Sequence, residues 1–237
     1  ADNIITPAME LGGNAPFIIL NDADLDAAVE GALVAKMRNV GEACTAANRF
    51  YVSSDIADEF VKKFSIRMAS LNIGSGLDPK TDVGPLINED TRTKVSDLVQ
   101  DAILRGAKLE LGGHIPKGKG FFYPPTVLSN VSPDSKCVYE EIFGPVAAIQ
   151  TFDNEDEVIT KANNTEYGLV AYVFTKDLKR GLKISEKLDY GMIGLNRGLV
   201  SDPAAPFGGT KQSGLGREGG HEGMLEFMET QYISLDW

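Results

Sequence analysis

The sequence predicts an α/β fold built around a mostly parallel sheet. Short apolar runs alternate along the chain with segments of about ten to fifteen residues that show helical periodicity, which is the pattern of βαβ units. The 237 residues are 43% hydrophobic and 24% charged, an ordinary composition for a globular chain. This length suffices for one large domain or two small ones.

The elements of the first half follow from periodicity and capping residues. FIIL (17–20) is a continuous apolar run, and turn and cap residues follow it at once. Segment 24–38 is expected to be helical because apolar side chains recur at helical spacing, at Leu25, Val29, Leu33 and Met37. The next expected elements are a strand over 50–53, a capped amphipathic helix over 54–71, a loop over 72–88 and a helix over 89–106.

The second half continues the alternation. Strands are expected over 107–113, 145–152, 168–175 and 191–196, with helices over 154–164 and 177–188. The Pro-rich stretch 115–128 is expected to be irregular. After Asn196 the chain reads as a Gly/Pro-rich loop to about residue 216, and the tail predicts one short helix and a final strand.

Charge and composition argue against several classes of partner. The net charge of −11 disfavours nucleic acid and anionic membranes, and no apolar stretch approaches the length of a membrane span. The first residues show no charged-then-apolar pattern, so no signal sequence is expected. His114 and His221 are isolated and no Cys stands at zinc-ligand spacing, so no metal site is expected. Two cysteines could form one disulfide but make no disulfide framework, which favours a reducing cytoplasm.

Cys44, in GEACTAANR (41–49), is the candidate nucleophile. It lies in the connection between the helix ending near Arg38 and the strand at Phe50, and such connections carry sites beyond the carboxyl ends of strands. The flanking Gly41 and small residues favour an exposed thiol in a turn that starts a helix, where backbone N–H groups stabilise a thiolate and an oxyanion. Composition alone leaves a buried structural thiol equally open.

Four segments together closely resemble the aldehyde dehydrogenase superfamily. They occur in the order of the family, with 34 residues from Glu10 to Cys44, and are MELGGNAPFI (9–18), GEACTAANR (41–49), EEIFGPV (140–146) and PFGGTKQSGLGREG (206–219). The resemblance runs from about Met9 to the C-terminus. It implies the three-layer α/β fold of that family's catalytic domain.

The resemblance also implies a domain organisation. Residues 9–205 would form the catalytic domain, and 206–237 a C-terminal loop, a short helix and a strand for oligomerisation, consistent with a homo-oligomer. Residues 1–8 fit no expected element and are interpreted as a cloning remnant. The family's nucleotide-binding half precedes the ELGG motif and has no counterpart in these 237 residues, so the chain looks like the catalytic half of a longer enzyme.

Carried over by resemblance, three residues perform the chemistry. Cys44 matches the nucleophile that attacks an aldehyde to form a thiohemiacetal, which passes a hydride to NAD or NADP and becomes a thioester. Glu10 matches the glutamate that activates water to hydrolyse the thioester. This fits the absence of a nearby histidine, since a carboxylate with a raised pKa can serve as base through water. Glu218 matches a second acid that relays protons, although a plain surface charge remains open.

Two residues match the cofactor side of the family's site. Glu141 corresponds to the glutamate that binds the nicotinamide ribose, and Phe143 to the aromatic residue beside the nicotinamide ring. The alternative is a loop that merely enters a strand. GLGREG (214–219) also fits the dinucleotide pattern G-x-G-x-x-G, but no apolar strand precedes it and only 18 residues follow, so this reading is rejected.

Two further residues point to the substrate class. Arg38 and Ser201 match residues that bind the substrate carboxylate in succinate-semialdehyde dehydrogenases, and a guanidinium fork suits a carboxylate. The alternative for Arg38 is a solvated cation at a helix C-terminus, and glutarate semialdehyde would use the same contacts. A thiol esterase or a non-catalytic assembly fragment also remains open.

Two positions depart from the family pattern. Some members of the subgroup carry a second cysteine where Ala46 stands, so a redox-switched disulfide cannot form there. Glu42 replaces the usual Gln and is expected to raise the pKa of Cys44.

Overall fold

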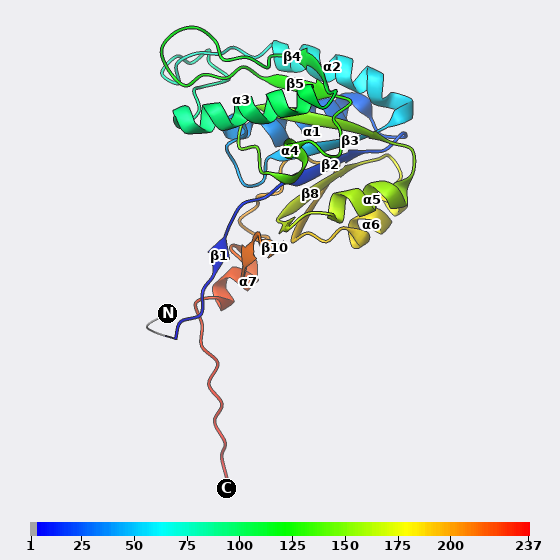
Figure 1. The fold of residues 1–237 in the computed structure, drawn as a ribbon. Coiled ribbons are helices and arrows are strands. Elements are labelled where there is room, and N and C mark those ends of the chain that lie inside the picture. Colours follow the sequence, from blue (N-terminus) through cyan, green and yellow to red (C-terminus); the bar gives the residue numbers. More distant parts are fainter. Residues whose placement is uncertain (1–3) are drawn as a thin grey trace.

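The fold is a seven-stranded sheet with helices on both faces, in the computed structural model that describes residues 4–237 (Figure 1). Within this range the strand order is β4-β5-β6-β3-β2-β8-β9. All neighbours are parallel except β4 and β5. The strands are β2 (Ala15–Ile19), β3 (Ala47–Ser53), β4 (Lys108–Leu111), β5 (Thr126–Ser129), β6 (Val146–Phe152), β8 (Val170–Phe174) and β9 (Met192–Leu195). The predicted α/β fold with a mostly parallel sheet is confirmed.

Alternating strand residues divide the core into two sides. On one side, α1 (Leu25–Met37) and α2 (Ala57–Ala69) pack on a cluster that includes Phe17 and Phe50. On the other side, α3 (Glu89–Leu104) and α4 (Lys136–Tyr139) pack around Ala148, and α5 (Glu155–Asn163) and α6 (Leu178–Lys187) pack around Tyr51. The strands of the sheet interior are buried on both faces, as parallel sheets usually are.

Side-chain caps explain where four helices begin. Asp24, Asn88, Asn154 and Asp177 each accept a hydrogen bond from a backbone N–H in the first turn of α1, α3, α5 and α6, respectively. These caps satisfy donors that a helix start leaves unpaired. The predicted helix over 54–71 instead begins with a 3-10 turn (Ser54–Ile56) before α2.

Two expectations about irregular segments are wrong. The Pro-rich stretch contains β5, whose residues are all buried, because Thr126 lies just past the prolines and pairs with β6. The tail, after α7 (Gly220–Leu225), does not form its predicted final strand. Residues 229–237 form no secondary structure and run away from the body, so they reach no strand edge within the described residues (Figure 1).

Two small antiparallel pairs join distant segments. β1 (Met9–Glu10) pairs with β11 (Gly214–Leu215), and β7 (Tyr167–Gly168) pairs with β10 (Thr210–Lys211). They fasten the long C-terminal loop to the start of the chain and to the sheet. Residues 1–8 were interpreted as a cloning remnant, and residues 1–3 of that segment lie outside the described residues. Within residues 4–237, no helix is long and apolar enough to cross a membrane.

Candidate active site

The candidate residues meet at the amino edge of the parallel strands. Glu10 precedes β2, Cys44 precedes β3 and Glu141 precedes β6. The expectation of a site beyond the carboxyl ends is therefore wrong for these residues. That rule concerns connections that leave a strand, whereas α1 has already carried the chain back across the sheet before Cys44 is reached.

Cys44 occupies a tight turn that leads into a strand. The amide of Ala46 donates to the carbonyl of Ala43 at 2.9 Å, and β3 begins at Ala47, so the expected helix start after Cys44 is not formed. The thiol is neither exposed nor fully buried. Burial chiefly raises the pKa of Cys44, the charges of Glu10 and Glu141 add to this, and the amides of Cys44 and Thr45 oppose it. The thiol is thus protonated near neutral pH and needs a base to act as a nucleophile.

Glu42 does not act on Cys44 as expected. Its carboxylate accepts a hydrogen bond from the amide of Ile87 at 3.1 Å, which directs it toward the loop before α3. The charges that raise the pKa of Cys44 are instead those of Glu10 and Glu141, which come from two other segments.

The second cysteine has a different environment. Cys137 is completely buried in the core beside α3, and burial raises its pKa to about 12. In the described part of the chain both cysteines are free thiols, so the possible disulfide is not formed. Only Cys44 combines partial access with nearby carboxylates.

Glu10 has the environment of a general base. It is partly exposed, but its Oε2 atom is enclosed and finds no hydrogen-bond partner within residues 4–237. Burial chiefly raises the pKa of Glu10, Glu218 raises it further, and Arg217 opposes this. A carboxylate with a raised pKa and a free acceptor can take a proton from water near neutral pH.

Two adjacent glycines bring three of the motifs together. A Cβ on Gly12 would lie 2.7 Å from Glu141 Oε2, and one on Gly13 would lie 2.4 Å from the carbonyl oxygen of Cys44. The amide of Gly13 also donates to Glu141 Oε1 at 2.9 Å. The glycines of ELGG therefore let the chain pass between the nucleophile turn and Glu141.

Glu141 and Phe143 share a constrained loop. Burial chiefly raises the pKa of Glu141, while the Gly13 amide, Lys94 and Lys36 oppose the shift. Phe143 has a φ of 56°, a left-handed conformation that is unusual for a bulky residue. This strain persists only where the surroundings hold the loop in place.

Arg38 and Ser201 lie together although they are far apart in the sequence. Arg38 Nη1 donates to Ser201 Oγ at 3.3 Å. Ser201 also lines a cavity of about 310 Å³ with Phe207 and the exposed Glu218, among other residues. Glu218 is fixed there by two backbone hydrogen bonds with Phe207. The structure thus places the expected carboxylate-binding pair beside the expected second acid.

Sequence reasoning missed the buried charged residue Lys36. Lys36, in the last turn of α1, is 0% exposed, and its Nζ atom donates to Asn48 Oδ1 at 2.7 Å and to the carbonyl of Gly144 at 3.2 Å. The available signal was its position, because Ala28, Ala32 and Lys36 follow one another at intervals of four along the buried face of the helix.

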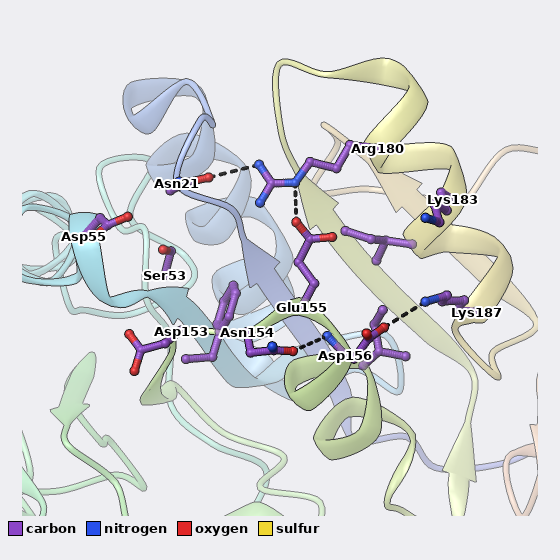
Figure 2. Close-up of a pocket in the computed structure, with 13 residues that line it drawn as sticks. Asn21, Ser53, Asp55, Asp153, Asn154, Glu155, Asp156, Arg180, Lys183 and Lys187 are labelled. Carbon is purple, nitrogen blue, oxygen red and sulfur yellow. Dashed lines mark hydrogen bonds and ion pairs between the residues drawn. The ribbon is translucent and has the colours of Figure 1, made fainter.

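The carboxyl edge holds a cavity of about 560 Å³ with a different character (Figure 2). Its charged groups largely neutralise one another: Arg180 bonds Glu155 and Asn21, and Lys187 bonds Asp156. It is lined by neither cysteine. Within residues 4–237, no group of three or more His, Cys, Asp or Glu residues could hold a metal ion.

A protonated thiol beside two carboxylates of raised pKa, at the amino edge of a parallel α/β sheet, is a candidate thiol-dependent active site. The chain belongs to the aldehyde dehydrogenase family, whose model, described as "Aldehyde dehydrogenase family", matches residues 1–233. This match includes the segment 1–8.

Individual relatives agree with this assignment. The chain is 52% identical over 233 residues to succinate-semialdehyde dehydrogenase of Paenarthrobacter nicotinovorans, covering 98% of this chain and 52% of that protein. It is 46% identical over 235 residues to glutarate-semialdehyde dehydrogenase of Pseudomonas aeruginosa, covering 99% and 49%. The crystal structure of an NADP-dependent enzyme of E. coli superposes with a TM-score of 0.94 at 46% identity, covering 95% and 47%. The chain therefore spans about half the length of the relatives it matches.

Proposed function

We propose that this chain is the catalytic part of an NAD(P)-dependent succinate-semialdehyde dehydrogenase, which oxidises succinate semialdehyde to succinate. The observation that carries the substrate assignment is the contact between Arg38 and Ser201. A guanidinium and a hydroxyl that lie within hydrogen-bond distance of each other offer several donors to a substrate carboxylate, and the fork of an arginine can bind both oxygens. The relative at 52% identity, named for this activity, supports the same substrate.

In the proposed mechanism, Cys44 attacks first and Glu10 later prepares water. Because the pKa of the Cys44 thiol is raised, the thiol must lose its proton to solvent water before it can react. The Cys44 sulfur then bonds the aldehyde carbon, and the amides of Cys44 and Thr45 are the candidate donors that stabilise charge at the turn. Arg38 and Ser201 orient the far carboxylate of the substrate throughout.

NAD or NADP, when bound, supplies the acceptor for the hydride that leaves the aldehyde carbon. Glu141 would hold the nicotinamide ribose and Phe143 would lie beside the ring. The hydrogen bond from the Gly13 amide to Glu141 Oε1 fixes the carboxylate beside the ELGG glycines, which supports this role. Glu10 then removes a proton from water, whose oxygen adds to the thioester carbon, and the Cys44 sulfur departs as succinate is released. Glu218 would pass the proton onward.

Glutarate semialdehyde is the second candidate substrate. It presents the same aldehyde and carboxylate with one more methylene between them, and the relative at 46% identity is named for it. We also propose a homo-oligomer, given the apolar side chains exposed along the C-terminal segment, and a reducing cytoplasm, which would keep Cys44 reduced.

Arg38→Leu in the full-length protein tests the substrate assignment. The change should lower kcat/KM for succinate semialdehyde by about 30- to 1,000-fold, roughly 2–4 kcal/mol, because charged hydrogen bonds to the carboxylate are lost. Butanal, which lacks the carboxylate, should be affected far less.

Arg67→Leu is the matched control, since Arg67 is a surface arginine that pairs with Glu30 on α1. Equal losses on both aldehydes would show that Arg38 only supports the nucleophile turn. A higher kcat/KM for glutarate than for succinate semialdehyde in the parent protein would select the second candidate.

A further inference from the structure

Lys36 is a buried cation that none of the proposed chemical steps uses. It projects from α1 into the protein and is fully enclosed. Its Nζ atom has two hydrogen-bond acceptors, Asn48 Oδ1 at 2.7 Å and the carbonyl oxygen of Gly144 at 3.2 Å. A buried ammonium is costly unless such partners compensate it, so the position requires an explanation beyond packing.

The two partners of Lys36 belong to the two loops of the site. Asn48 lies in β3, four residues after Cys44, and Gly144 follows Phe143 in the loop that begins with Glu141. The same carbonyl of Gly144 approaches Gly41, where an added Cβ would lie only 2.2 Å away. Gly144 is therefore the point at which the nucleophile turn touches the Glu141 loop, and Lys36 bonds it from the side of the core.

Electrostatics couple Lys36 to Glu141 as well. Lys36 lowers the pKa of Glu141, together with Lys94, whose Nζ donates to the Glu141 carbonyl at 2.7 Å. In return the charge of Glu141 partly opposes the effect of burial, which lowers the pKa of Lys36 to about 7. The two groups thus respond to each other across the junction of the loops.

We propose that Lys36 is a positioning residue that holds the Glu141–Phe143 loop in register with the nucleophile turn. Because its Nζ atom bonds both Gly144 and Asn48, Lys36 holds Glu141 and Phe143 at a fixed position relative to the turn that carries Cys44. The inference rests on the proposed function in one respect, namely that Glu141 would bind the ribose of the cofactor.

Hydrogen exchange of the full-length Lys36→Met protein tests the positioning directly. Without the ammonium, amides 140–144 should exchange at least about tenfold faster, because the loop loses its tether and opens locally. Amides of the α5–β8 core should change less than about twofold. Lys62→Met, at an exposed lysine on α2, is the control and should leave amides 140–144 unchanged.

Unchanged exchange of amides 140–144, or an equal increase throughout the core, overturns the proposal. If Lys36→Met does not fold, Asn48→Ala removes one of the two partners of Lys36, and it should raise exchange of the same amides by a smaller factor. Asn48→Ala with exchange equal to that of the parent would likewise contradict the role.

Kinetics provide a second readout. Lys36→Met should raise KM for NAD or NADP by about tenfold while KM for the aldehyde changes less than about twofold. Alkylation of Cys44 by iodoacetamide without nucleotide should stay within about twofold of the parent rate. Equal changes in both KM values would indicate a general structural defect and overturn the proposal. A parent protein that oxidises no aldehyde refutes the proposed function alone, since hydrogen exchange still decides the role of Lys36.

Discussion

Cys44 and Cys137 show how the same side chain acquires different chemistry from its surroundings. Both have a raised pKa because both lose water, but Cys137 is enclosed by core residues while Cys44 keeps partial access. Beside Cys44 stand two carboxylates that the sequence places 34 residues before it and 97 residues after it. Composition could not separate the two thiols, and only the motif around Cys44 favoured it.

Alkylation of Cys44 should depend on pH in a way that follows from its raised pKa. Iodoacetamide reacts with the thiolate, so the rate should be low at pH 7 and still be rising at pH 9, because the pKa of Cys44 is raised above the 9.0 of an unperturbed thiol. Glu10→Gln removes one of the charges that raise the pKa, and it should speed alkylation at pH 7.5 by a few fold. A plateau below pH 8 in the parent chain would contradict the raised pKa, and Cys44→Ala controls for reaction at Cys137.

Glu10→Gln in the full-length protein should separate the two halves of the reaction. Hydride transfer needs no water at the thioester, so the first turnover should proceed while hydrolysis slows. The expected trace is a burst of NAD(P)H followed by turnover slowed by at least about a hundredfold, within the range for loss of a general base. Stopped-flow absorbance measures both phases. Loss of the burst together with turnover would mean that Glu10 is required before the thioester forms.

At the residue scale, the sequence was most informative where a motif carried the chemistry. Cys44, Glu10 and Glu141 were found from their neighbours, and Arg38 with Ser201 from the subgroup pattern. Lys36 was missed because its role depends on Gly144, which lies 108 residues away. The effect assigned to Glu42 was wrong because the sequence does not show that its carboxylate turns toward Ile87.

At the scale of elements, the short turn between α1 and β3 determines where the nucleophile lies. Asn39, Val40 and Gly41 all have positive φ, at 49°, 59° and 79°. Three consecutive left-handed residues reverse the chain within a few residues of the helix end. Gly41 alone among them can do so without a steric penalty, and it also meets the Gly144 carbonyl closely.

Gly41→Ala should therefore destabilise the protein and impair Cys44. The added Cβ would lie 2.2 Å from the Gly144 carbonyl oxygen, in a backbone conformation that disfavours it, and we expect a loss of roughly 2–4 kcal/mol in the free energy of unfolding. Gly76→Ala is the matched control, because no atom lies within 4 Å of its added Cβ. Urea unfolding of both variants measures the difference. Equal stability of Gly41→Ala and the parent would show that the turn can rearrange freely.

Helices and strands were predicted correctly where a hydrophobic period runs over many residues. They were missed where only pairing with a distant strand determines the structure. The long helices and the central strands were all expected. β5 was missed because prolines precede it and its four residues are too few to show a period. The site was assigned to the wrong edge of the sheet because a sequence shows the order of elements but not the direction in which each one crosses.

At the scale of the whole molecule, the chain carries contacts for only part of a dinucleotide. Glu141 and Phe143 are the candidate contacts to the nicotinamide side, and two such contacts contribute only about 1–3 kcal/mol each against the larger cost of immobilising a free dinucleotide. We therefore expect this 237-residue chain to fold but to bind NAD and NADP weakly, with a Kd above about 100 μM. Calorimetric titration measures this directly, and tighter binding of either nucleotide would show that the chain alone holds the adenosine half.

The pairing of β1 with β11 has a consequence for the order of events during synthesis. Gly214, the partner of Glu10, lies about 200 residues further along the chain, so at typical translation rates roughly 10–40 s pass before the two can meet. Until then Glu10 has neither Glu218 nor Arg217 beside it. The charges that set the pKa of Glu10 are therefore complete only after residue 218 has been made, later than every element of the seven-stranded sheet.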